Sequence, residues 1–164
     1  MESRFKVFGH AAHPILIVFP LGLLATSVIF DIVNLIWPDP QFSIAAYWMI
    51  VGGLIGGLVA AVPGLVDWLA IPKDTRAKRI GLYHAIGNDI VLVLFAISWW
   101  WRRGAANHTP DTLALALSIV AFLLALLTGW LGGELIERLG MAVYDGAHLD
   151  APSSLSGRPA RENE

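Results

Sequence analysis

The chain has 164 residues, of which 56% are hydrophobic, with a mean hydropathy of +0.64 and a formal net charge of −2. This apolar share exceeds that of ordinary globular domains, and the charge offers no basic surface for nucleic acid. The absence of cysteine excludes disulfides, thiolate ligands and cysteine nucleophiles, so any metal must be held by His and carboxylate side chains.

Four apolar runs follow a short N-terminal segment, residues 1–13, which we expect to be cytoplasmic or interfacial and not a removable signal peptide. Each run is long enough for a bilayer core, which requires roughly 20 residues. The runs are Pro14 to Trp37, Ser43 to Ile71, Ile80 to Trp101 and Thr112 to Leu139. Because an unpaired backbone is too costly in lipid, the sequence predicts an all-α integral membrane protein, a four-helix up-down-up-down bundle over residues 14–140.

The basic residues predict the orientation. Nine of the eleven Lys and Arg residues lie before the first run, between the second and third, or after the fourth, and only Arg102 and Arg103 lie on the other side. The positive-inside rule therefore places both termini in the cytoplasm, in a multi-pass membrane protein. The Pro, Ser, Gly and charge content of residues 141–164 predicts a disordered cytoplasmic tail.

Polar residues gather at those ends of the runs that such a bundle brings to the cytoplasmic side. They are His10, His13, Asp67, His84, Asn88, Asp89, Glu134 and Glu137. Ionisable groups within spans are expensive, usually face the bundle interior and indicate function. Because the first and third spans are diagonal in a simple bundle, we expect His13 and His84 to face each other at similar depth.

These residues predict a cofactor site. With Asp67 and Glu134, the imidazoles of His13 and His84 offer a ligand set for a transition-metal ion. The same two histidines could instead be the axial ligands of haem b, although Pro14 leaves His13 shallow for a porphyrin buried in lipid. His10, Asn88 and Trp130 are secondary candidates. In the competing interpretation the carboxylates simply pair with the imidazoles and no cofactor is bound.

Other features have simpler interpretations. Tight helix packing is the simpler explanation of a stripe of small residues on the second span: Gly53, Gly57, Ala60 and Gly64. Asp31 lies about five helical turns after His13 and should form a structural ion pair with Arg102 or Arg103 at the opposite membrane side. His108 and His148 are expected to be solvated, in a loop and in the tail.

Several strings of the sequence resemble a family of small bacterial membrane proteins catalogued as domain of unknown function 2231. They are His13-Pro with Phe19-Pro20 and Asp31, Gly64-Leu-Val-Asp67-Trp68, His84 with Asn88, and Gly129-Trp-Leu-Gly-Gly-Glu134-Leu. The resemblance covers nearly all of the chain from His10 to Gly140 and implies four membrane helices in the bacterial cytoplasmic (inner) membrane. Some relatives are joined to Rieske-type iron–sulfur domains, which implies electron transfer. Relatives often continue with a Gly-Val-Gly-Val-like string where this chain reads Met141-Ala-Val-Tyr144.

The sequence therefore favours a redox or electron-transport membrane protein that binds haem b or a metal ion. The alternative is a structural or assembly subunit without a cofactor. A proton or solute pathway is disfavoured because few polar residues are evident in the outer halves of the spans, and no serine or cysteine constellation supports a hydrolytic enzyme. The lipid bilayer is the expected partner, whereas a redox protein partner and a homo-oligomer are left open.

Overall fold

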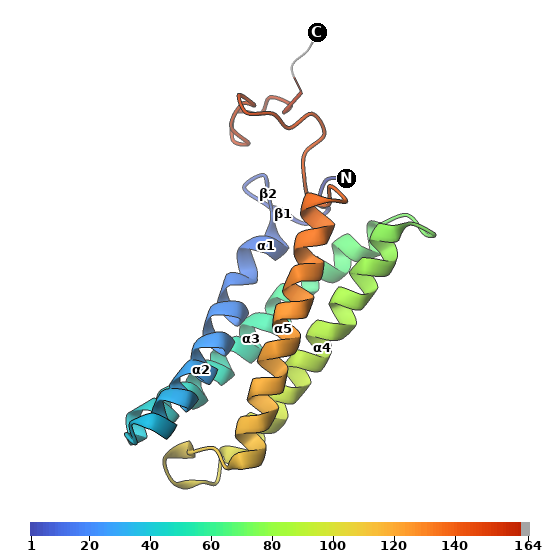
Figure 1. Cartoon of the computed structure of the whole chain (residues 1–164). Coiled ribbons are helices and arrows are strands. Elements are labelled where there is room, and N and C mark those ends of the chain that lie inside the picture. Colours follow the sequence, from blue (N-terminus) through green and yellow to red (C-terminus); the bar gives the residue numbers. More distant parts are fainter. Residues whose placement is uncertain (162–164) are drawn as a thin grey trace.

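The computed structural model describes residues 1–161 and forms one bundle of long antiparallel helices (Figure 1). Helices α1 (Ala12–Leu16) and α2 (Val18–Ile36) make the first crossing, followed by α3 (Pro40–Ala70), α4 (Arg76–Arg102) and α5 (Thr112–Glu137). All four crossings are long and apolar enough to span a membrane. The predicted all-α, up-down-up-down bundle is confirmed. The other elements of residues 1–161 are short: strands β1 (Lys6–Val7) and β2 (His10–Ala11), and the 3-10 turn η1 (Ala106–His108).

A break at Ile17 divides the first crossing into α1 and α2. Pro20 has no backbone N–H, so the carbonyl of Leu16 loses the partner it would have four residues later. The amide of Ile17 still donates to the carbonyl of His13, and the amide of Leu21 donates to the carbonyl of Ile17. The chain therefore continues past the break in nearly the same direction (Figure 1).

Helices α3 and α4 begin earlier than the predicted residues 43 and 80. Asp39 caps α3 by accepting from the backbone N–H of Gln41, and Pro40 occupies the first turn, where its missing N–H costs nothing. Thr75 caps α4 by accepting from the backbone N–H of Lys78. Three of the basic residues between the second and third predicted runs, Arg76, Lys78 and Arg79, therefore belong to the first turn of α4.

The distribution of side chains is inside out compared with that of a water-soluble protein. Large apolar side chains cover the outside, as with Leu58 and Leu127, which are each 65% exposed. Polar side chains are instead buried, among them Asp31 and Arg102 at 1% exposure and Ser98 at 0%. In water such a surface would promote aggregation, whereas in a bilayer it is covered by lipid.

Glycines of α3 allow its neighbours to approach closely. A Cβ atom added at Gly53 would lie 2.5 Å from the Leu24 side chain of α2, and one added at Gly57 would lie 2.6 Å from Leu92 of α4. These glycine faces are therefore filled by the side chains of adjacent helices. Tight packing, the simpler interpretation of the small-residue stripe, accounts for them.

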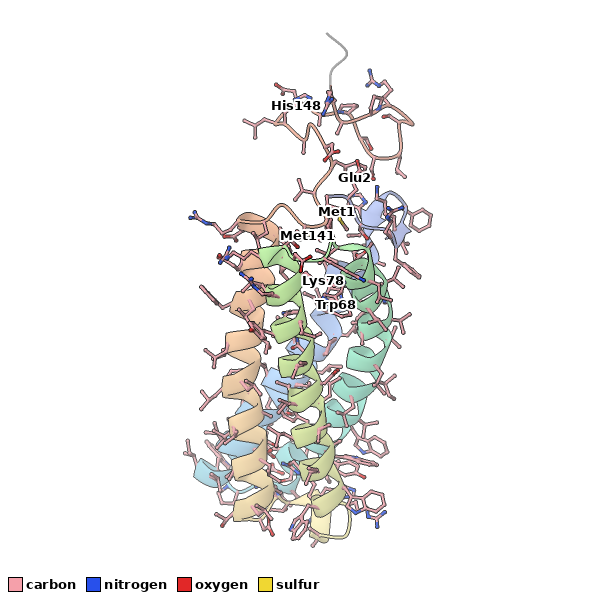
Figure 2. All side chains as sticks on the ribbon, turned by 90° about the vertical axis from the view of Figure 1, so that its right-hand side faces the viewer. Met1, Glu2, Trp68, Lys78, Met141 and His148 are labelled. Atoms are coloured by element: carbon pink, nitrogen blue, oxygen red, sulfur yellow. The ribbon has the colours of Figure 1, made fainter. Side chains whose placement is uncertain are left out.

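Both ends of the described chain and the α3–α4 connection lie at one end of the bundle, here called the inner end. Figure 2 shows Met1, Trp68, Lys78 and Met141 together there, with His148 farther out in the tail. Lys78 Nζ lies 3.9 Å from the centre of the Trp68 ring and donates to the Trp68 carbonyl, while Trp68 Nε1 donates to the Lys78 carbonyl. These contacts close the α3–α4 hairpin. The opposite end of the bundle is called the outer end.

The segment after α5 contains neither helix nor strand between residues 138 and 161. The disorder expected of residues 141–164 stays a prediction. Its last three residues, 162–164, lie outside the described residues.

Candidate functional site

His13 of α1 and His84 of α4 meet inside the bundle near its inner end. Their ring centroids are 6.1 Å apart, and the ring planes are inclined at 84°. The first crossing and α4 are diagonal, since each packs against both α3 and α5. The two rings therefore come together across the middle of the bundle. His84 lies about 12 Å along the helix axis from the start of α4.

Each imidazole is oriented by a hydrogen bond to a backbone carbonyl of another helix. Nδ1 of His13 lies 2.8 Å from the carbonyl oxygen of Ala60 on α3, and Nδ1 of His84 lies 2.8 Å from that of Thr128 on α5. Because a carbonyl oxygen can only accept, Nδ1 is the nitrogen that carries the proton. In the neutral ring, Nε2 of each histidine then has a lone pair that can accept a hydrogen bond or bind a cation.

A glycine makes room for each ring, four residues after the carbonyl that the ring contacts. A Cβ added at Gly64 would lie 2.8 Å from Nδ1 of His13, and one added at Gly132 would lie 3.1 Å from Cε1 of His84. The two helical hairpins of the bundle thus hold their histidines in the same way. The two halves of the sequence share little beyond hydrophobicity, so this correspondence emerges only in three dimensions.

Asn88 connects His84 to α5. Its Nδ2 donates to the His84 carbonyl at 2.8 Å and to His84 Nε2 at 3.2 Å, while its Oδ1 accepts from the Thr128 hydroxyl at 3.0 Å. Thr128 therefore holds His84 twice, through its own carbonyl and through Asn88. Thr128 was not among the predicted residues, and its only signal in the sequence is a hydroxyl four residues before Gly132.

Asp67 and Glu134 turn to partners other than the imidazoles. The Asp67 carboxylate accepts from the Ser3 hydroxyl at 2.7 Å and from the backbone N–H of Arg4 at 2.6 Å, and Glu134 accepts from Arg76 at 2.5 Å. Within residues 1–161, no three His, Cys, Asp or Glu side chains form a group that could hold a metal ion. Of the expected four-residue ligand set, the structure thus brings together the two histidines alone, because donors nearer to each carboxylate satisfy it.

The N-terminal segment and the start of the tail cover the inner end of the bundle. The Asp67 carboxylate accepts hydrogen bonds from residues 3–5 and so holds this segment against α3. Within the segment, a hydrogen bond from Lys6 lowers the pKa of the Glu2 carboxyl below its ordinary value. Lys6 Nζ also lies 4.1 Å from the centre of the Tyr144 ring, and the Tyr144 hydroxyl donates to the Gly9 carbonyl. This covering lies over the end at which the two histidines meet.

The remaining candidates lie apart from the histidine pair. His10 is exposed on β2, with Nδ1 3.2 Å from the Phe8 carbonyl, and Trp130 is 67% exposed on the outside of α5. His148 is exposed in the tail, as expected. His108 is less solvated than expected: it is half-buried, and its ring stacks on that of Tyr47 with the centroids 3.8 Å apart, because η1 folds back against α3.

A buried ion pair lies toward the outer end. Nη1 of Arg102 donates to both carboxylate oxygens of Asp31 at 2.9 Å, and Nη2 lies 3.0 Å from the Ser98 hydroxyl and 3.3 Å from the Ser118 hydroxyl. Both charged side chains are fully buried. The structural ion pair expected for Asp31 is confirmed, with Arg102 as its partner.

An apolar layer separates this ion pair from the histidines. It consists of Leu24, Val28, Ile50, Val91, Phe95 and Ala121. The outer half of the bundle holds more polar groups than the sequence suggested, because serines that read as part of apolar runs face inward around Arg102. In the described part of the chain, the apolar layer, not a shortage of polar residues, interrupts a polar route through the bundle.

Comparison with known families gives one match. A family model described as "Predicted membrane protein (DUF2231)" matches residues 9–145, which include both histidines and the helices of all four crossings. No curated protein and no solved structure matches the chain significantly.

Proposed function

This chain belongs to the DUF2231 family of predicted membrane proteins, and we propose that it is a membrane-embedded redox protein that holds a metal ion between His13 and His84. The observation that carries the proposal is the pair of imidazoles, 6.1 Å apart, each with Nδ1 committed to a carbonyl. Two Nε2 lone pairs lie in an apolar bundle, where water is scarce. A cation is a partner that both can share.

The geometry suits a single ion. A metal-ligating histidine typically donates its other ring N–H to a carboxylate or a backbone carbonyl, as both rings do here. A metal about 2.0 Å from each of two ring nitrogens in a line separates the ring centroids by about 6 Å, close to the observed 6.1 Å. Imidazole ligands suit copper, zinc, iron and nickel. Asn88 Nδ2 donates to His84 Nε2 at 3.2 Å, so an ion bound between the two rings would replace this hydrogen bond.

Haem b is less well supported as the form of the centre. A porphyrin between the two imidazoles would need open glycine faces around it. Gly64 and Gly132 are instead covered by the imidazoles themselves, and Gly57 and Gly87 by Leu92 and Thr128. The residues present therefore fit an ion better than a macrocycle.

Electron transfer is the proposed use of the centre, and the support for it is the resemblance to relatives joined to Rieske-type domains. The proposal includes a redox partner that docks at the inner end, near the histidines. It also places the protein in the bacterial cytoplasmic membrane with the inner end in the cytoplasm, since nine of the eleven Lys and Arg residues belong to that side.

Metal analysis and visible spectroscopy test the proposal. Protein purified in mild detergent, after expression with iron, copper and haem precursor supplied, should contain about one metal ion per chain. His84→Ala and His13→Ala should each abolish that content while the helical content is retained. His10→Ala is the matched control, because His10 is exposed and away from the pair, and it should bind as the wild type does. A Soret band lost in His84→Ala would establish the haem form instead.

A structural or assembly subunit is the second candidate. The observation that favours it is that both imidazoles already have backbone partners, which lock the first crossing to α3 and α4 to α5. In that case His84→Ala should lower the melting temperature and change no metal stoichiometry. Wild-type protein that is colourless and metal-free under the conditions above would contradict the redox proposal and leave this one.

A further inference from the structure

Asp89 occupies an unusual place for a carboxylate. It lies at the midpoint of α4, about 20 Å along the helix axis from either end, and its side chain is exposed on the outside of the bundle. The three ion pairs among residues 1–161 involve Glu2, Glu134 and Asp31 instead. No hydrogen bond within the described residues reaches the Asp89 carboxylate.

Lipid is a poor environment for this side chain. An ionised carboxylate at the centre of a bilayer costs about 2.5–3.5 kcal/mol even on the more lenient scales, and such groups almost always face a protein interior or a partner. Asp31 follows that rule through its pair with Arg102, and His84 follows it through the Thr128 carbonyl. Asp89 departs from it, so a partner outside this chain is needed to cover it.

The other exposed side chains on this face of α4 are apolar. Steps of three and four residues along α4 give a strip of exposed side chains: Leu82, Ala85, Ile86, Val93 and Ile97. The small side chain of Ala85 lies one turn before Asp89, which allows a second helix to come close at that level. The strip therefore has the form of a helix-packing face with one polar group at its centre.

We propose that this strip, centred on Asp89, is the contact between two copies of the chain. Two copies in one membrane have the same orientation, so a two-fold axis along the membrane normal places each residue opposite itself at equal depth. Two carboxyl groups that hold one proton between them form a hydrogen bond in which one donates and the other accepts, so the Asp89 of a second copy can be the partner that Asp89 lacks within its own chain. The exposed Lys and Arg side chains of residues 1–161 all lie near helix ends or beyond them, so a contact of Asp89 with a different face of the chain would offer no cation at this depth.

Disulfide cross-linking in native membranes locates the contact. Because the chain has no cysteine, a single substitution supplies one reactive thiol. Val93→Cys, at a position 56% exposed beside Asp89, should give cross-linked dimers under mild oxidation. Ile29→Cys is the matched control, since it is 54% exposed on α2, diagonal to α4, and should stay monomeric. Equal cross-linking at both positions would overturn the proposal.

A dimerisation assay tests the chemistry of the contact. The purified full chain is labelled and placed in lipid bilayers, and energy transfer between labelled copies measures their association. Asp89→Leu should weaken dimerisation about ten-fold, the equivalent of about 1.4 kcal/mol, while its helical content stays at the wild-type level. Asp89→Asn, whose amide also donates and accepts, should retain most of the association. A wild-type chain that stays monomeric in bilayers, or an Asp89→Leu variant that dimerises as the wild type does, would refute it. A wild type that is monomeric alone and cross-links through Val93→Cys to a different protein would also refute it.

Discussion

Asp31 and Arg102 illustrate how single charges are kept inside an apolar bundle. Their carboxylate and guanidinium are fully buried and joined by two contacts of 2.9 Å, and the Ser98 and Ser118 hydroxyls take further N–H groups of the guanidinium. Removing one member of such a pair leaves the other buried and uncompensated. Removing both members does not have this effect.

We therefore expect Arg102→Ala to destabilise the protein by about 3–5 kcal/mol. The double variant Asp31→Leu with Arg102→Met should lie much closer to the wild type. Arg103→Ala is the control, because the Arg103 side chain lies at the surface over the Trp100 ring. Unfolding in detergent, followed by circular dichroism, measures the three free energies. Equal losses of stability in Arg102→Ala and in the double variant would show that the pair stabilises the protein through the packing of its side chains and not through its charges.

At the scale of helices, close approach depends on particular glycines. A Cβ at Gly53 would lie 2.5 Å from the Leu24 side chain, whereas one at Gly129 has nothing within 4 Å. Substitutions at these two positions distinguish two effects of glycine: it allows close packing, and it destabilises a helix by roughly 1 kcal/mol relative to alanine.

Gly53→Ala should destabilise the bundle by about 1–3 kcal/mol, because α2 must shift away from α3. Gly129→Ala should be neutral or stabilise it by up to about 1 kcal/mol, since its only effect is a better helix former. Thermal unfolding of both variants in the same detergent makes the comparison. A Gly53→Ala variant as stable as the wild type would mean that Leu24 moves aside at no cost.

Helix positions were largely predictable from sequence, and their first residues were not. The predicted starts at residues 43 and 80 followed the onset of continuous hydrophobicity, whereas α3 and α4 begin at Pro40 and Arg76. Helices begin where a cap satisfies the first free N–H groups, and Asp39 and Thr75 provide those caps in polar segments. Hydrophobicity marks the part of a helix in lipid, and capping marks its true start.

At the scale of the whole molecule, the distribution of basic residues predicts the orientation in the membrane. The structure places both described termini and the α3–α4 connection at one end, and withdraws Arg102 from the other end into its buried pair. Of the eleven Lys and Arg residues, Arg103 is then the one that lies exposed at the outer end. This strengthens the charge asymmetry on which the prediction of a cytoplasmic inner end rests.

Reporter fusions in cells test this orientation. A fusion after the tail should be active as a cytoplasmic reporter, and one inserted between residues 104 and 110 should be active only as an extracytoplasmic reporter. Reversing the charge bias, by placing several lysines in that outer loop and neutralising Lys73, Arg76 and Arg79, should produce a mixed topology. An extracytoplasmic C-terminus in the unaltered chain would contradict the assignment.

The sequence by itself determined the number of crossings, their antiparallel order and the end at which the polar residues gather, because run length and loop length are local properties. It also paired Asp31 with an arginine, since a charge in lipid has few permitted partners. Only the tertiary structure decided which side chains meet. Successive residues of a helix differ by about 100° in direction, so the rotation of α4 turns Asn88 toward Thr128 of α5 and leaves Asp89 facing outward. That rotation follows from the packing of every neighbouring helix, and no single run of residues encodes it.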